Sequence, residues 1–396
     1  MISLSEARAL IKEKLSPIPA RSLPLFSLTG GVLREDVVAG EDSPAFDRSA
    51  MDGYAVGLDD SSRQFRVIGE IQPGHLPSLQ IKPGEAARIF TGAAIPAGAT
   101  QVIKQEDVRL EDGIITVPKR SHTTHIRSRG EDVKKGSLLL KSGTRLGPGE
   151  LALLASFGVS APLVAPAVRV AHFTTGNEIV APAQTPFPGQ IRDSNSSLVA
   201  AFIHQHGGKM IQQDRLPDDF DALRSAVGPS LSQTDLLLIS GGASVGDYDF
   251  GKKLLTTLGF QIHFTTLNLR PGKPLVFATR QAQAAFILPG NPVSHFVTLN
   301  VAVRLALEQL SGTDIKWPVA NLKLAEALDF RPDGREIFSP ARVQIEAGEL
   351  VVHPLHWQSS GDVTGLIGAN ALIQLPPNAP AHTVGETVPV LLLSTP

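Results

Sequence analysis

The segment from Thr234 to Phe250, TDLLLISGGASVGDYDF, constrains the fold of this chain more than any other stretch. Its residues Leu236–Ile239 form a short, unbroken apolar run, which is typical of a strand buried on both faces of a parallel sheet. A glycine-rich turn, Ser240–Gly246, follows this run, and a helix is predicted from Phe250 to Leu258. This strand–turn–helix unit favours an α/β domain.

The turn after this strand has residue types suited to an anion. Glycine has no Cβ to keep a ligand away, and consecutive turn amides form a concavity that binds anions. The candidate binding residues are Ser240, Gly241, Gly242, Ser244 and Gly246, and the carboxylates Asp247 and Asp249 follow them directly. Carboxylates beside a phosphate site indicate a nucleotide or phosphate ester held with Mg²⁺. An ordinary strand–helix connection contains the same residue types, so local chemistry leaves both interpretations open.

The chain around this segment alternates between strand and helix patterns, which is the mark of an open, doubly wound sheet. Strands are predicted at Val168–Phe173, Met210–Gln212, Phe260–Leu267, Leu275–Ala278 and Ala284–Leu288, and helices at 195–206, 218–227 and 292–310. In such sheets, ligands bind in the crevice beyond the carboxyl ends of the strands.

Three predicted strand ends carry unusual residues. Thr174-Thr175-Gly176 is followed by Glu178, and a second end is the Ser240 turn. The third is Pro289, Gly290, Asn291 and Pro292, which enters a predicted helix whose free N–H groups suit an anion. Arg270 and Lys273 add two cations beside a strand start. Each feature is weak alone, but together at one sheet edge they predict a phosphate site.

The regions outside this domain have a different texture. Short β-like runs split by turns extend from about residue 44 to 132, and an apparent helix with capping-box spacing begins at Ser3-Leu4-Ser5-Glu6. We therefore predict a β-rich module at 44–132 inserted into an N-terminal domain built from 1–43 and 133–166. The α/β domain is predicted at 167–312. Residues 313–396 are Pro-rich with short alternating runs, typical of a small β-barrel or sandwich.

Composition excludes several classes of protein. The 396 residues are 42% hydrophobic and 19% charged, with a formal net charge of −2, so neither nucleic acid nor a membrane surface is an expected partner. The absence of cysteine excludes disulfides, thiolate metal sites and cysteine nucleophiles. With no apolar run long enough to span a bilayer and no signal-peptide pattern at the N-terminus, a cytoplasmic location is expected.

Five motifs in this chain resemble the molybdopterin molybdenumtransferase (MoeA) family, which includes the E domain of gephyrin. They are FDRSAMDGYAV (Phe46–Val56), IFTGAAIPAGA (Ile89–Ala99), RSRGEDVKKG (Arg127–Gly136), SGGASVGDYDF and LPGNPVS (Leu288–Ser294). The resemblance implies an elongated N-terminal domain with the inserted β module, an α/β domain like that of the adenylyltransferase MogA, and a small C-terminal β-barrel. It also implies a homodimer that inserts molybdate into adenylylated molybdopterin, with release of AMP dependent on Mg²⁺ or a similar divalent cation.

The resemblance also assigns roles to individual residues. Asp52, Asp132, Glu178, Asp218 and Asp249 match catalytic positions of the family, and Glu178, Asp218 and Asp249 are the implied metal ligands. Thr91, Arg127, Arg270, Lys273 and Ser360 match positions that bind the substrates. In the family, the α/β domain of one subunit and the β module of the other form the site.

The chain departs from the family where a Lys is usual at both Thr266 and Arg270. Loss of a Lys at Thr266 removes a cation from the implied oxyanion pocket, and Arg at 270 replaces a compact charge by a planar fork. An alternative function is therefore a divergent, non-catalytic paralogue that binds molybdopterin or serves as a scaffold. Retention of the five carboxylates favours the enzyme, which would work with a MogA-type partner.

Overall fold

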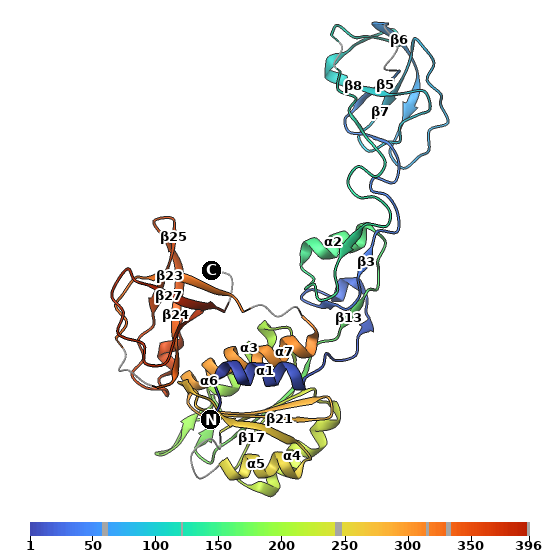
Figure 1. The fold of residues 1–396 in the computed structure, drawn as a ribbon. Coiled ribbons are helices and arrows are strands. Elements are labelled where there is room, and N and C mark those ends of the chain that lie inside the picture. Colours follow the sequence, from blue (N-terminus) through green and yellow to red (C-terminus); the bar gives the residue numbers. More distant parts are fainter. Residues whose placement is uncertain (58–61, 120–121, 242–247, 314–316, 330–333, 394–396) are drawn as a thin grey trace. The chain divides into compact units, whose positions relative to one another are not determined.

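The structure is a computed structural model that describes residues 1–57, 62–119, 122–241, 248–313, 317–329 and 334–393, without the side chains of Tyr248 and Asp249. The chain divides into two compact units. The first unit comprises Met1–Glu35, Gly143–Leu151 and Ala161–Pro396 and contains an α/β sheet and a β-barrel. The second comprises Asp36–Ser142 and Ala152–Ser160 and contains a β-rich module. Figure 1 shows the elements of each unit in sequence colours.

A six-stranded sheet forms the centre of the first unit, in the order β17-β14-β18-β22-β21-β19. The strands are β14 (Arg169–Thr175), β17 (Lys209–Leu216), β18 (Leu236–Ser240), β19 (Gln261–Thr266), β21 (Pro274–Arg280) and β22 (Gln283–Leu288). Strands β17, β14, β18 and β22 are parallel. At one edge, β21 runs antiparallel to both of its neighbours, β22 and β19. The predicted doubly wound α/β fold is confirmed, with this antiparallel edge as an addition.

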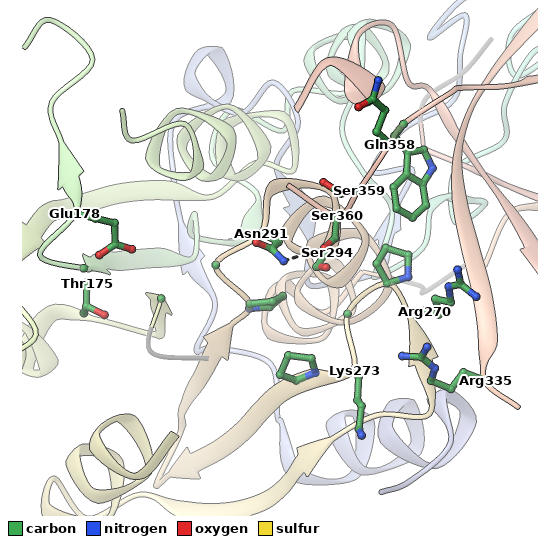
Figure 2. A pocket seen from close by; sticks show the side chains of 18 of the residues that line it. Thr175, Glu178, Arg270, Lys273, Asn291, Ser294, Arg335, Gln358, Ser359 and Ser360 are labelled. Atoms are coloured by element: carbon green, nitrogen blue, oxygen red, sulfur yellow. Dashed lines mark hydrogen bonds between the residues drawn. The ribbon is translucent and has the colours of Figure 1, made fainter. Parts of the chain in front are cut away.

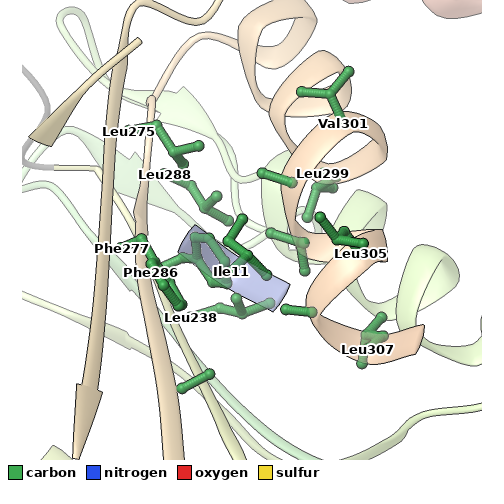
Figure 3. Packing of buried hydrophobic residues seen from close by; sticks show 14 of the residues in the cluster. Ile11, Leu238, Leu275, Phe277, Phe286, Leu288, Leu299, Val301, Leu305 and Leu307 are labelled. Atoms are coloured by element: carbon green, nitrogen blue, oxygen red, sulfur yellow. The ribbon is translucent and has the colours of Figure 1, made fainter. Parts of the chain in front are cut away.

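Strand β18 is buried on both faces, as its apolar run predicts. Leu236 and Leu238 belong to one core cluster, and Leu237 and Ile239 to another, because successive side chains of a strand point to opposite faces. The first cluster includes residues of α1 (Leu4–Lys14) and of the helical segments that follow β22 (Figure 3). The second includes residues of α4 (Phe220–Ser230) and α5 (Tyr248–Thr257).

The helices of this unit begin and end where their sequences allow. They are α1 (Leu4–Lys14), α3 (Asn195–Gln205), α4 (Phe220–Ser230), α5 (Tyr248–Thr257), α6 (Pro292–Thr298) and α7 (Arg304–Ser311), with a π-helical turn over Leu299–Val303 between the last two. The capping box at α1 is confirmed, since Ser3 Oγ accepts from the Glu6 N–H and Glu6 Oε2 accepts from the Ser3 N–H. Gly312, at φ +71°, ends α7 in the left-handed conformation.

Five strands close into a barrel in the C-terminal region. They are β23 (Val319–Leu324), β24 (Glu336–Glu346), β25 (Glu349–Pro354), β26 (Ala371–Leu375) and β27 (Thr387–Leu392). The order β24-β25-β23-β27-β26 returns to β24, so the sheet has no free edge between these strands. A two-residue strand, β20 (Leu269–Arg270), pairs in parallel with the start of β24. The barrel prediction is confirmed.

The second unit contains the six-stranded sheet β8-β5-β7-β6-β10-β9. Its strands are β5 (Gly53–Val56), β6 (Gln64–Ile71), β7 (Glu85–Ile89), β8 (Gln101–Lys104), β9 (Arg109–Glu111) and β10 (Ile114–Thr116). Two-stranded pairs are formed by β3 (Val37–Val38) with β12 (Leu138–Leu140) and by β4 (Arg48–Ser49) with β11 (Ile126–Arg127). Buried Tyr54, Phe65 and Ile115 lie in one of its cores.

The remaining elements are short. In the first unit, β1 (Arg21–Ser22), β2 (Val32–Leu33) and β13 (Leu163–Ala165) form a three-stranded sheet, and β15 (Ile179–Val180) pairs with β16 (Ile191–Arg192). Helix α2 spans Pro148–Ser156. Within the described ranges, no helix combines the length and apolar character needed to cross a membrane.

Candidate functional site

A cleft of about 730 Å³ opens at the carboxyl ends of β14, β18 and β22 in the first unit (Figure 2). The α/β sheet contributes Thr175, Gly176, Glu178, Asp218, Gly241, Arg270, Pro271, Gly272, Lys273, Pro274, Pro289, Gly290, Asn291 and Ser294. The barrel region contributes Arg335, Trp357, Gln358, Ser359 and Ser360. All three predicted strand ends therefore meet at one cavity, where a doubly wound sheet binds its ligands.

Glycine is required where β18 enters the cleft. Gly241 has φ +101°, and a Cβ at this position would lie 2.2 Å from the Thr175 carbonyl oxygen. A side chain would therefore force the ends of β14 and β18 apart. This close approach keeps the backbone of both strand ends at the wall of the cleft.

The cleft combines cations with carboxylates. Arg270, Lys273 and Arg335 bring three positive side chains to one cavity, and Figure 2 shows them near one another. Glu178 and Asp218 line the same cavity, and among the described residues neither carboxylate accepts a hydrogen bond or forms an ion pair. Such a cavity suits a ligand that carries an oxyanion and a metal-bound phosphate.

The turn after β22 is fixed by three side chains from outside it. His295 Nδ1 donates to the Pro289 carbonyl at 2.9 Å, and Asn195 Nδ2 donates to the Gly290 carbonyl at 2.6 Å. Asn291 makes no capping hydrogen bond to α6. Its Nδ2 donates instead to Ser360 Oγ at 2.8 Å, and the Val293 N–H donates to the Ser360 carbonyl at 3.0 Å. The barrel region is thereby bonded to the turn.

The predicted residues of the first unit divide into three groups. Glu178, Asp218, Gly241, Arg270, Lys273, Pro289, Gly290, Asn291 and Ser360 line the cleft. Ser240 does not, because its side chain is fully buried and its Oγ lies 2.6 Å from His172 Nε2; Pro292 starts α6 and is also absent from the lining. Gly242, Ser244, Gly246 and the Asp249 side chain fall outside the described residues.

Thr266 lies away from the position expected of it. It is the last residue of β19, pairs with Pro274 and accepts the Ile2 N–H through its carbonyl, but it is not among the residues that line the cleft. Arg270 does line it. The expectation that Thr266 faces the oxyanion is therefore not supported, because β19 ends before the chain turns into the cleft.

The predicted residues of the β module form two local pairs in the second unit. Asp52 Oδ1 accepts hydrogen bonds from the Thr91 N–H at 2.8 Å and from Thr91 Oγ1 at 2.7 Å. These bonds lower the pKa of Asp52 below its usual value, and the bond from the backbone N–H has the larger effect. Arg127 forms a short ion pair with Asp132. Both pairs are exposed at the surface of this unit.

Five cleft residues with polar or aromatic side chains were missed by the sequence interpretation: Ser294, Arg335, Trp357, Gln358 and Ser359. Ser294 is the last residue of the LPGNPVS motif and could have been added to it. Arg335 reaches the cleft because β20 pairs with the start of β24, which aligns Leu269 with Glu336. Two-residue strands leave no periodicity to detect, so the sequence contains no signal for this pairing.

The residues present suit a divalent cation only in part. Among the described residues, no group of three His, Cys, Asp or Glu side chains could hold a metal ion. Glu178 and Asp218 do supply two hard oxygen donors at one cavity. Because Mg²⁺ is commonly held by one or two carboxylates together with substrate phosphates and waters, this donor set fits such an ion.

Comparisons with known proteins match nearly the whole chain. A model of the MoeA N-terminal region (domain I and II) matches residues 2–158, that of a probable molybdopterin binding domain matches 171–309, and that of the MoeA C-terminal region (domain IV) matches 321–393. A molybdopterin biosynthesis MoeA protein from Pyrococcus horikosii is 30% identical with a TM-score of 0.84, and the match covers 100% of both chains.

Curated relatives agree with these matches. The molybdopterin molybdenumtransferase of Nostoc sp. is 35% identical, over 93% of this chain and 88% of the relative. That of Haemophilus influenzae is 34% identical, over 98% of both chains. With full-length similarity, three matching regions and the strand-end motifs gathered at one cleft, the chain belongs to the MoeA family of molybdopterin molybdenumtransferases.

Proposed function

We propose that this protein is a molybdopterin molybdenumtransferase that inserts molybdate into adenylylated molybdopterin and releases AMP. The observation that carries the proposal is the single cleft that combines Arg270, Lys273 and Arg335 with Glu178 and Asp218. The reaction requires sites for two anions of different kinds. One is a free tetrahedral oxyanion, and the other is the phosphate chain of the adenylylated substrate.

The cationic half of the cleft is the proposed molybdate site. Lys273 is exposed and Arg335 half-buried, and both line the same cavity as the hydroxyl-bearing Ser294 and Ser360. Charged donors form hydrogen bonds to an oxyanion that are about twice as strong as those of neutral donors. We propose that the guanidinium and ammonium groups neutralise molybdate while the serine hydroxyls orient its oxygens.

The carboxylate half is the proposed site of the phosphate chain. Glu178 and Asp218 would hold Mg²⁺ there, and the ion would neutralise charge that builds up on the phosphates as AMP leaves. We propose that Asp249 is a third ligand, as the family resemblance implies. The carboxylates also orient the reacting groups.

We further propose that the protein acts as a homodimer and takes its substrate from a MogA-type adenylyltransferase. In this proposal a second copy of the chain supplies Asp52, Thr91, Arg127 and Asp132 to the reaction. Mixing an Asp52→Ala chain with an Asp218→Ala chain tests it. Recovery of activity after verified subunit exchange is expected, and no recovery would refute the shared site.

Single-turnover release of AMP from adenylylated molybdopterin tests the function itself. We expect rapid release that requires both molybdate and Mg²⁺. Chelation of divalent cations should abolish release, and added Mg²⁺ should restore it. Tight binding of the substrate without molybdate-dependent release would instead identify a non-catalytic binding protein, the alternative that the sequence left open.

A further inference from the structure

We infer that Asn195 and His295 are positioning residues that aim the backbone N–H groups of Gly290 and Asn291 into the cleft, where they bind a tetrahedral oxyanion. This inference rests on the proposed function and deepens it. Neither Asn195 nor His295 lines the cleft. Each acts through a carbonyl of the turn instead.

The direction of the two N–H groups follows from peptide geometry. The bonds from Pro289 to Gly290 and from Gly290 to Asn291 are trans, so the C=O and N–H of each peptide unit point in opposite directions. The Pro289 carbonyl points to the fully buried His295, and the Gly290 carbonyl points to Asn195. The N–H groups of Gly290 and Asn291 therefore point away from these side chains.

The space on the other side is open and these donors are available. Gly290 and Asn291 are exposed and line the cleft, and a Cβ at Gly290 would meet no atom within 4 Å. Within the described part of the chain, neither N–H donates a hydrogen bond. Two adjacent N–H donors that face a cavity with three cations are an arrangement that binds an oxyanion.

Both positioning residues have a buried hydrogen-bond acceptor that is left without a donor in the described part of the chain. His295 donates through Nδ1 to a carbonyl, so its Nε2 is an acceptor, and this buried atom has no partner among the described residues. Asn195 donates through Nδ2, and within the same ranges its buried Oδ1 has no partner either. A buried acceptor left without a donor lowers stability. Both unpaired acceptors belong to side chains that donate to carbonyls of the same turn. This indicates that the hydrogen bonds to the turn, rather than maximal stability, set the orientation of these two side chains.

Substitutions of His295 can separate its role as a hydrogen-bond donor to the turn from its contribution to packing. His295→Leu removes the donor, whereas His295→Asn keeps a donor nitrogen bonded to Cγ, as Nδ1 is. Thr234→Val is the matched control, since it removes a buried hydrogen bond, from Thr234 Oγ1 to the Ser230 carbonyl, at a residue outside the cleft. Asn195→Leu removes the second donor from a half-buried position and serves if His295→Leu does not fold.

The experiment is equilibrium binding of sodium molybdate and, separately, of inorganic phosphate by calorimetry. We expect His295→Leu and Asn195→Leu to weaken binding by about tenfold, the value of roughly one hydrogen bond to a charged group. His295→Asn should stay within about twofold of wild type, and Thr234→Val should bind normally even if its melting temperature falls. A loss confined to molybdate or to phosphate identifies which oxyanion the turn holds, and either supports the inference.

Three results would overturn it. They are unchanged binding in His295→Leu and Asn195→Leu, equal weakening in all variants including Thr234→Val, and no binding of either oxyanion by the wild-type protein. The proposed function is judged separately, by molybdate-dependent release of AMP from the wild-type protein. A protein that releases AMP normally but fails the binding test would refute only the positioning roles.

Discussion

The carboxylates of the two units are held in opposite ways. In the second unit, Asp52 accepts two hydrogen bonds from Thr91, and Asp132 is ion-paired with Arg127. In the first unit, Glu178 and Asp218 line a cavity, and their carboxylates have no such partner among the described residues. The carboxylates of the second unit are therefore already paired within their own unit, whereas those of the cleft share a cavity with three cations but are bonded to no described side chain.

This difference separates orientation from binding. A carboxylate with its hydrogen bonds satisfied is fixed in one position and stays ionised, which suits a group that orients a reactant. A carboxylate without partners beside a large cavity is suited to a cation that arrives with the substrate. We therefore expect variants in the cleft to have large effects on metal-dependent activity, and variants at the paired sites to act more weakly.

The largest expected effect is that of Glu178→Gln, which removes the charge and keeps the shape. Loss of one electrostatic contact to a transition state costs about 3 kcal/mol, so AMP release should slow by about a hundredfold. Glu178 is exposed, so thermal stability should not change. The matched control is Glu13→Gln, at an exposed carboxylate of α1 outside the cleft, which should react at the wild-type rate. Equal rates for both variants would show that the open carboxylate is not used.

Mild acid should destabilise the first unit before the second. Burial lowers the pKa of His295 to about 4 and that of His172 to about 3, from the usual 6.5. Between pH 6.5 and about 4, the unfolded state binds protons that the folded state does not. Stability is therefore complete above pH 6.5 and falls by about 1.4 kcal/mol per pH unit for each histidine. The Asp52 carboxyl, with a pKa lowered from 3.8, loses its contribution only at lower pH.

Hydrogen exchange at pH 7 and pH 5, corrected for the intrinsic pH dependence, measures this difference. Peptides that cover β18 should lose protection at pH 5, and peptides that cover β7 should not. The variant His295→Asn should show a weaker pH effect in β18. Equal loss of protection in both strands would contradict the assignment of the acid sensitivity to the buried histidines.

A smaller effect is expected from Gly290→Ala. The added methyl group would meet no atom within 4 Å, so folding stability should change by less than about 1 kcal/mol. The methyl group would project into space that an oxyanion needs, and molybdate affinity should fall by about fivefold. Gly40→Ala is a control in the second unit, where a Cβ also meets nothing within 4 Å. Calorimetric titration of both variants with molybdate gives the comparison.

The smallest effect is expected from Thr91→Val. This variant removes the hydroxyl donor to Asp52 and leaves the backbone N–H donor, which is the larger cause of the lowered pKa. The pKa of Asp52 should therefore rise only part of the way to its usual value. Carboxyl-carbon NMR titration of wild type and Thr91→Val measures the shift. A pKa that does not move would mean that the hydroxyl contributes nothing to this site.

Much of the fold could be predicted from sequence because periodicity and turn residues carry local information. The apolar run at Leu236–Ile239 identified a doubly buried strand, and Ser3 with Glu6 identified the start of α1. The antiparallel edge was not specified, although only Gln281 and Ala282 join β21 to β22 and so short a connection permits only antiparallel pairing.

The site was predictable only where its residues belong to motifs. The turn Pro289–Asn291 and Glu178 follow strands directly, so their meeting at one sheet edge follows from the fold. Arg335 and Trp357 come from loops of the barrel region and do not follow a strand of the α/β sheet. His295 was not identified because its role depends on which carbonyl its Nδ1 meets. Such contacts are set by packing, which sequence patterns do not record.

The location of the metal-containing substrate tests most directly whether the cleft of the first unit is the oxyanion site. Crystals of the protein grown with molybdate can be measured at the molybdenum absorption edge, where an anomalous difference map shows molybdenum alone. We predict a peak in the cleft, within hydrogen-bonding distance of Lys273, Arg335 and the Gly290 N–H. A saturated crystal with molybdenum bound only at the second unit, or nowhere in the cleft, would contradict this assignment.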